Sequence, residues 1–418
     1  MVDIDRREFL RRSATAAAGL TGAAAFLAAC ADEGSSTFAA PSNAANAITL
    51  PRPDSPVSLP LFDDNPAVRS DAAIEAGPLK IYQWKSYLYD EILDDFRSRF
   101  DVELVVEDFT DMDEAVTEVR SGRMSEFDIF FPSIGYLGPM VQERLVRPLN
   151  HDLLPNMKDL WSYFRGSDGP FYDAGQRYTV PYTVYGTGIA WRKDMLARSD
   201  WPTSLDDPYD AFWRKVPQGK VGIYDDYREA LSMALLRNGV QDVNTADPAA
   251  IDEAASALVE AARKRDVMLG DDGAYEGIPS GEFALHQSWS GDILSASSGE
   301  RFADQASDIG YLWPKGGVIG ADLTAVLANG QNPVLAHAFV NFLMDCEVAW
   351  TNYSWNGYQP PVMMPAEDQK WTPAVPTVTL KESDLDDARW LCPLEPRVDA
   401  LWHSAWDRVR GVAELEED

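Results

Sequence analysis

Two carboxylates, Asp226 and Glu229, lie three residues apart where a strand-like run gives way to a helical pattern. This spacing suits a capping box, in which the first acid caps the helix and the second lies at its third position. It also suits a site for a positively charged ligand, because ionised carboxylates accept strong hydrogen bonds from ammonium groups. A helix N-terminus favours the ionised form of nearby acids. We therefore expect both carboxylates to be ionised and to serve the helix and a ligand together.

A further acid, four aromatic residues and a serine follow or border other predicted strands. They are Trp84, Tyr87, Ser133, Tyr136, Trp289 and Asp322. Taken singly, the two tryptophans also fit a hydrophobic core, and Asp322 also fits a turn cap. Because ligands of open α/β sheets bind at the carboxyl edge of the strands, we expect these side chains to line one acidic and aromatic cleft. Carboxylates would hold ammonium groups, and aromatic faces would contact methylene chains and add cation–π attraction, so the pattern predicts a site for a small organic cation.

Signatures of common enzymes are missing from the sequence. It contains no Gly-x-Ser-x-Gly elbow, no phosphate-binding loop and no dinucleotide fingerprint, and its four histidines (His151, His286, His337 and His403) lack metal-ligand spacing. We expect a protein that is not an enzyme and needs no metal or cofactor. One enzymatic alternative is a hydrolase that uses Asp226 and Glu229 as acid and base. It would need one raised pKa, which a helix N-terminus opposes.

The first 30 residues are predicted to be a targeting segment. The stretch "DRREFLR", which contains Arg6 and Arg7, resembles a twin-arginine export signal. A small-residue apolar run, too short and too rich in alanine to span a bilayer, leads into "LAAC", which resembles a lipobox ending at Cys30. Two acyl chains on that cysteine would hold the protein on a membrane. We expect export to the outer face of the cell membrane or the periplasm with a lipid anchor at Cys30; the alternative is an ordinary cleaved signal.

The charge and length of the chain limit the kinds of partner that the protein can bind and the number of its domains. The net charge of -31 opposes binding to nucleic acid and electrostatic docking on an anionic membrane. It favours cationic solutes slightly, although a solvated acidic surface is the simpler explanation. The length of 418 residues suits two α/β domains. Cys346 and Cys392 could form a disulfide in an oxidising compartment or remain free buried thiols.

The predicted elements alternate between strands and helices, which indicates a helix-covered sheet. Residues 31–76 are expected to be a flexible linker. Residues 178–191 form a long extended run that contains Pro181 and suits a chain crossing between two lobes, and residues 322–328 suit a return crossing. Hydrophobic periodicity predicts helices over residues 89–100, 112–119, 227–238, 248–264, 333–345 and 346–355.

From about Leu79 to Arg410 the chain resembles the spermidine/putrescine-binding proteins of bacterial ABC importers. The matching stretches are "YQWKSYLYDEILDDF", "FDIFFPS", "YTVPYTVYGTGIA", "YDDYREALSMALLRNG", "QSWSGD", "WPKGG" and "NGYQPP". The resemblance implies a two-lobed periplasmic-binding-protein fold of the type II kind with two crossing segments. Lobe 1 would comprise residues 77–185 with 322–362, and lobe 2 would comprise residues 186–321 with 363–418.

The resemblance also implies roles for individual residues. Asp226 and Glu229 would hold ligand amines, and Asp322 a further amine. Trp84 and Trp289 would wall the methylene chain, whereas Tyr87, Ser133 and Tyr358 would line the pocket. The implied partners are a polyamine and the subunits of an ABC permease, with the protein itself a monomer.

Three positions depart from the family pattern. Lys85 stands where an acid is frequent, and Gly135 and Gly320 stand where the family usually has aromatic residues. A shorter diamine, or another small solute bound by the same fold, is therefore an alternative to a full-length triamine.

Overall fold

The computed structural model describes residues 49–165, 169–202, 209–213, 220–265, 267–270, 273–298, 308–363 and 375–413. The predicted targeting segment with Cys30 lies outside the described residues.

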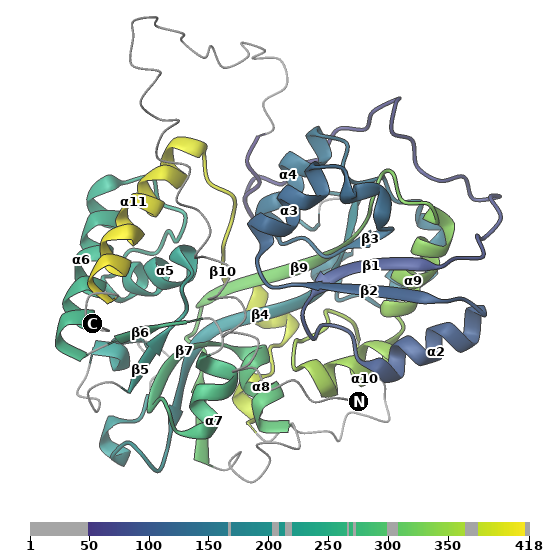
Figure 1. Ribbon diagram of the computed structural model, residues 1–418. Helices are drawn as coiled ribbons and strands as arrows, with labels where there is room; N and C mark the ends of the chain where they lie inside the picture. The colour runs from purple at the N-terminus through teal and green to yellow at the C-terminus, as the bar shows by residue number, and fades with distance from the viewer. Residues whose placement is uncertain are drawn as a thin grey trace, which may run out of the picture. The chain divides into compact units, whose positions relative to one another are not determined.

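Ten strands in the described part of the chain form one mixed sheet (Figure 1). The main path runs, in sheet order, through β2 (Leu104–Phe109), β1 (Leu79–Trp84), β3 (Ile129–Phe130), β9 (Val318–Val326), β4 (Thr179–Arg192), β7 (Leu285–Trp289), β5 (Val221–Ile223) and β6 (Val267–Leu269). Beside this path, β10 (Arg389–Trp390) pairs with β9 and β8 (Ile309–Leu312) pairs with β4. Strands β2, β1 and β3 are mutually parallel, as are β7, β5 and β6.

The antiparallel strands β4 and β9 join the two halves of the sheet. The first part of β4 pairs with β9, and its last part pairs with β7 and β8. The end of β9 in turn pairs with β3. The two predicted crossing segments are therefore these strands, and the expected lobe boundaries at residues 185 and 321 fall inside them.

Helices cover both halves. In the half with β1–β3, Figure 1 shows α3 (Met112–Arg120) and α4 (Ile134–Gln142) on one side of the sheet and α2 (Asp90–Phe100) and α10 (Cys346–Asn356) on the other. The remaining helices are α5 (Tyr227–Arg237), α6 (Pro248–Arg265), α7 (Ile278–Ser280), α8 (Ser290–Ser298), α9 (Pro333–Leu343) and α11 (Pro396–Ala413). All six helices predicted from the sequence are present, with ends that differ by one or two residues.

Two hydrophobic clusters of buried residues stabilise the halves. The first contains the inward face of α2, namely Ile92, Leu93 and Phe96, together with β1, β3 and α9. The second surrounds α5 and α6 and includes Trp402 of α11, which is fully buried. Burial of large apolar side chains on both sides of a sheet is the main source of stability in such a fold.

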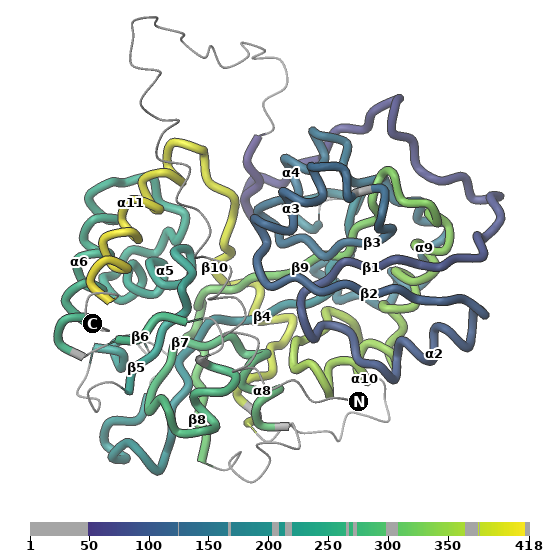
Figure 2. The backbone as a smooth tube through the Cα atoms, viewed as in Figure 1, coloured from purple at the N-terminus to yellow at the C-terminus, as the bar shows by residue number. Residues whose placement is uncertain are grey.

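The described part of the expected linker contacts the folded body. Leu59 is 1% exposed, and the backbone carbonyls of Leu59 and Pro60 accept hydrogen bonds from Arg177 and Tyr178. Asn65 donates a hydrogen bond to the carbonyl of Val146. Figure 2 shows the purple trace of this segment running along the outside of the half that contains β1–β3 before it enters β1. Leu59, Pro60 and Asn65 are thus held against the folded body by specific contacts, which their composition did not predict.

Cys346 and Cys392 are both free thiols, so the alternative without a disulfide is the one observed. Within the described ranges, no helix has the length and apolar character needed to span a membrane.

Candidate functional site

The N-terminus of α5 carries the first pair of acids. Asp226 is the N-cap residue, and its carboxylate accepts hydrogen bonds from the backbone N–H groups of Arg228 (2.8 Å) and Glu229 (3.0 Å). The predicted cap is therefore confirmed. Only half of the expected capping box forms, however, because the Glu229 side chain turns away from the helix and toward β4 and β7.

Glu229 is 2% exposed, and both of its carboxylate oxygens accept hydrogen bonds. Thr187 Oγ1 donates to Oε2 at 2.7 Å, and the indole N–H of Trp289 donates to Oε1 at 3.0 Å. Burial, followed by the nearby charge of Asp226, raises the pKa of Glu229 to about 8. Burial also raises the pKa of Asp226, although the backbone donors oppose this shift. For Glu229, removal from water outweighs the helix dipole, so the expectation that the helix N-terminus keeps this acid ionised was wrong.

A second acidic centre lies on β9. Asp322 is 4% exposed and accepts hydrogen bonds from Ser133 Oγ (2.5 Å) and from the hydroxyl of Tyr87. Burial raises the pKa of Asp322 to about 6, and these two hydrogen bonds limit the increase. Ser133 is the N-cap position of α4, and Tyr87 lies in the loop after β1, so the edge of the first half of the sheet supplies all three residues.

A row of contacting aromatic rings connects the two acidic centres. Trp289 stands next to Glu229 and meets Tyr185 edge-on, with ring centroids 5.8 Å apart. Tyr185 contacts Tyr358 at 6.0 Å, and Tyr358 contacts Tyr87, the partner of Asp322, at 5.7 Å. Trp289, Tyr185 and Tyr358 are half-buried, so each presents part of its surface to solvent. We call these three rings the aromatic row. It has the composition expected for contact with a hydrocarbon chain between two cationic ends.

Two predicted residues lie outside the aromatic row. Trp84 packs against Phe109 of β2 with ring centroids 4.7 Å apart. The hydroxyl of Tyr136 donates a hydrogen bond to Asp113 of α3 at 2.9 Å. Burial and Asp113, with smaller effects from Tyr227 and Asp226, raise the pKa of Tyr136, which places it within electrostatic reach of the start of α5.

Sequence reasoning missed four residues of the site. Tyr185 and Thr187 lie two positions apart on β4 and share one face of that strand, a period-two signal visible in the sequence. Tyr224 stacks on Trp289, with centroids 4.1 Å apart and ring planes 20° apart. Asp292, at the start of α8, accepts hydrogen bonds from the hydroxyls of Tyr224 and Tyr358, both at 2.6 Å. No pattern in the sequence joins Asp292 to Tyr358, because 66 positions separate them.

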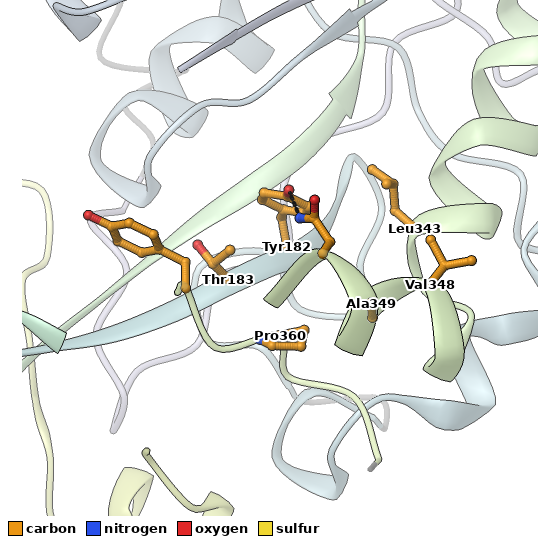
Figure 3. Close-up of a pocket in the computed structure, with 8 residues that line it drawn as sticks. Tyr182, Thr183, Leu343, Val348, Ala349 and Pro360 are labelled. Carbon is orange, nitrogen blue, oxygen red and sulfur yellow. Dashed lines mark hydrogen bonds between the residues drawn. The ribbon is translucent and has the colours of Figure 1, made fainter. Parts of the chain in front are cut away.

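A small cavity of about 10 Å³ lies next to Tyr358, between β4 and α10 (Figure 3). Tyr182, Thr183 and Asn352 are among its lining residues. Asn352 donates a hydrogen bond to the Tyr182 hydroxyl at 2.7 Å, and that hydroxyl donates to the carbonyl oxygen of Tyr87, also at 2.7 Å. The cavity is only large enough for about one water molecule, which is too small for a solute, and the hydrogen bonds beside it hold the Tyr87 loop.

The three departures from the family pattern have different surroundings. The Lys85 side chain is exposed. A Cβ added at Gly135 would meet nothing within 4 Å, whereas a Cβ added at Gly320 would lie 2.4 Å from both Cζ and the hydroxyl oxygen of Tyr185. Gly135 therefore leaves open space, whereas Gly320 is covered by the Tyr185 ring from the neighbouring strand.

Comparison with known proteins decides the family. The model of the bacterial extracellular solute-binding protein family matches residues 91–378, which is more than half of the chain. The chain belongs to this family. Its fold and family are those of substrate-binding transport proteins rather than of enzymes, and family membership indicates a protein that acts outside the cytoplasm.

Individual relatives agree with the resemblance seen in the sequence. A spermidine/putrescine-binding periplasmic protein of Haemophilus influenzae is 26% identical over 271 residues, which are 64% of this chain and 71% of that protein. A putrescine/cadaverine-binding protein of Pseudomonas aeruginosa is 24% identical over 279 residues, 65% of this chain and 76% of that protein. The resemblance to the spermidine/putrescine-binding proteins is therefore confirmed at the level of sequence similarity.

Solved structures confirm the predicted fold class. A spermidine/putrescine ABC transporter substrate-binding protein from Streptococcus pneumoniae superposes with a TM-score of 0.65 at 20% identity, covering 80% of this chain and 99% of that chain. A lipoprotein of Treponema pallidum gives a TM-score of 0.66 at 22% identity, covering 79% of this chain and 98% of that chain.

Among the described residues no cluster of acids, histidines or cysteines has the arrangement needed to hold a metal ion.

Proposed function

We propose that this member of the solute-binding family captures a polyamine, putrescine or spermidine, between its two lobes and delivers it to the permease of an ABC importer. The observation that carries the proposal is a pair of acidic centres joined by the aromatic row. Asp226 and the buried Glu229 form one centre, and the buried Asp322 forms the other. Ammonium groups leave water only where ionised acceptors replace their hydration, and the methylene chain between them favours apolar ring surface. The names of the relatives from Haemophilus influenzae and Pseudomonas aeruginosa support the same ligand class.

The mechanism we propose is hinge closure about β4 and β9 without covalent chemistry. These two strands are the segments shared by both halves, so a small change in their twist would move one half against the other. Closure over the ligand would exclude water and strengthen each charge interaction. Release to the permease would require the reverse motion. We expect the protein to act as a monomer.

The test is native mass spectrometry of protein purified from its host, read for a co-purified ligand of defined mass. Titration calorimetry with putrescine, cadaverine and spermidine then measures affinity, with a neutral sugar and a neutral amino acid as controls. We expect a dissociation constant in the micromolar range or below for at least one amine, and no heat from the controls. A well-folded protein that binds a control solute but none of the amines would replace this function with the alternative of a different small solute, which the open space at Gly135 would accommodate.

We also propose that the protein is exported through the twin-arginine route and anchored by acylation of Cys30. The order of Arg6-Arg7, the apolar run and "LAAC" supports this proposal. The Cys30→Ser variant should lose incorporation of labelled fatty acid and leave the membrane fraction, whereas Cys346→Ser should remain there. Retention of C30S in washed membranes would contradict the lipid anchor without affecting the ligand proposal.

A further inference from the structure

We propose that Tyr185 is a specificity-determining residue that forms the middle of the ligand site, replacing from β4 the side chain that Gly320 of β9 does not supply. This inference rests on the proposed function and assigns a contact to a residue for which sequence reasoning predicted no role.

The first support is the register of the two crossing strands. Tyr185 is the direct cross-strand partner of Gly320, so a side chain at either position would lie on the same face of the sheet. The end of the Tyr185 ring occupies the space above the glycine, where an added Cβ would lie 2.4 Å from Cζ. A ring from β4 and a side chain from β9 thus exclude one another at this point.

The second support is the position of Tyr185 among the acids. Its strand neighbours on the same face are Thr183, the cross-strand partner of Asp322, and Thr187, which donates a hydrogen bond to Glu229. The Tyr185 ring therefore lies between the two acidic centres. Burial, followed by the charges of Asp322, Glu229 and Asp226, raises the pKa of its hydroxyl, which agrees with a phenol within electrostatic reach of all three carboxylates.

The third support is that Tyr185 has surface available for a ligand. The residue is half-buried, although its ring contacts Trp289 and Tyr358 at either side. No hydrogen bond to a described residue fixes its hydroxyl, so the ring contacts define its position. A flat apolar face between two groups of acids is the surface that a methylene chain would cover.

The experiment is titration calorimetry with putrescine and spermidine on the full mature chain, with thermal melting to verify folding. Tyr185→Phe should bind as the wild type does, and Tyr185→Ala should bind putrescine about ten-fold more weakly, since it loses ring contact with the hydrocarbon. Gly320→Ala should also weaken binding by pushing the ring aside, but should have no further effect in the Y185A background. Tyr275→Ala, which removes a tyrosine that is 40% exposed, is the matched control and should change nothing.

The outcomes separate the inference from the function on which it rests. If the wild type melts normally but binds no amine, both fail. If the wild type binds putrescine and Y185A binds it equally well, or if G320A weakens binding as much in Y185A as in the wild type, only the role of Tyr185 is overturned. Should Y185A fail to fold, G320A carries the test, because it displaces the ring without creating a cavity.

Discussion

The indole N–H of Trp289 donates a hydrogen bond to Glu229 at 3.0 Å, while the same ring stacks on Tyr224 at 4.1 Å. One side chain therefore fixes the orientation of a buried acid and also offers apolar surface beside it. Thr187 holds the second oxygen of Glu229, so the carboxylate is oriented before any ligand arrives. Preorganisation of this kind reduces the entropy lost on binding.

The charge of Glu229 can be tested without disturbing its neighbours. In Glu229→Gln the amide oxygen can accept from Trp289, and the amide N–H can donate to the Thr187 hydroxyl, so the local network is preserved. We expect amine affinity to fall by about 10- to 100-fold, as a charge-assisted hydrogen bond is replaced by a neutral one. Calorimetry measures the loss, and a single cooperative melting transition verifies that E229Q is folded. Equal affinity in E229Q would show that Glu229 does not contact the ligand.

The Asp226→Asn variant separates the capping role from the ligand role. Asparagine is as good an N-cap as aspartate, so the hydrogen bonds to Arg228 and Glu229 should survive and the free energy of unfolding should change little. Amine affinity should still fall by about ten-fold, because a negative charge is lost. Asp345→Asn, which changes the N-cap of α10 in the same way, is the matched control. If D226N unfolds readily while D345N does not, stabilisation of α5 is the main duty of Asp226.

The affinity for amines should depend on pH. Without ligand, Glu229 has a pKa of about 8 and Asp322 of about 6, so both are partly or largely protonated below these values. An ammonium group favours the ionised forms, and binding must therefore release protons. We expect affinity to rise by up to about ten-fold per pH unit between pH 6.5 and 8 and then to level off. Calorimetry in two buffers of different ionisation enthalpy counts the released protons; a count of zero at pH 7 would contradict the raised pKa values.

The sequence predicted the parts of the structure that depend on local periodicity and on end signals. The helix that starts at Asp226 is an example, since the cap and the apolar pattern lie in one continuous stretch. Contacts between distant residues were not predicted: Asp128, just before β3, holds the start of α9 by accepting hydrogen bonds from Asn332. Partners that are 204 positions apart have no local signal.

Some residues of the candidate site could likewise be predicted from local sequence, and others could not. Asp226, Glu229, Trp289 and Asp322 could be proposed from their positions after strands. The structure places the three acids toward the ends of the aromatic row, to which Trp289 belongs. The raised pKa of Glu229 could not be predicted, because it results from burial of this side chain against β4 and β7 in the folded protein. The role of Tyr185 also required the register of β4 against β9, which no spacing within either strand reveals.

The stability of the ligand-free protein should also depend on pH. The folded-state pKa of Glu229 lies above its ordinary value of 4.5, so the folded protein binds more protons than the unfolded chain between about pH 4.5 and 8. Stability from this group is fully present below pH 4.5 and is lost as pH rises through 8. Asp322 acts in the same direction between pH 3.8 and 6. We expect the melting temperature to fall as pH rises from 5 to 8.5, and the fall to be smaller in E229Q. A melting temperature that rises over this range would contradict the sign.

The hydrogen bond from Tyr87 to Asp322 should help to set the lowest pH at which the protein still binds amines. This bond favours the ionised carboxylate, so Tyr87→Phe should raise the pKa of Asp322 above about 6 and shift the lower part of the pH profile for amine binding toward higher pH. Ser133→Ala removes the other donor and should shift the profile in the same direction. At pH 8.5, where Asp322 stays ionised in each variant, affinity should differ from that of the wild type by less than about three-fold, since the remaining donor still orients the acid. A loss of affinity in Y87F that is equal at every pH would instead mean that the Tyr87 hydroxyl contacts the ligand directly.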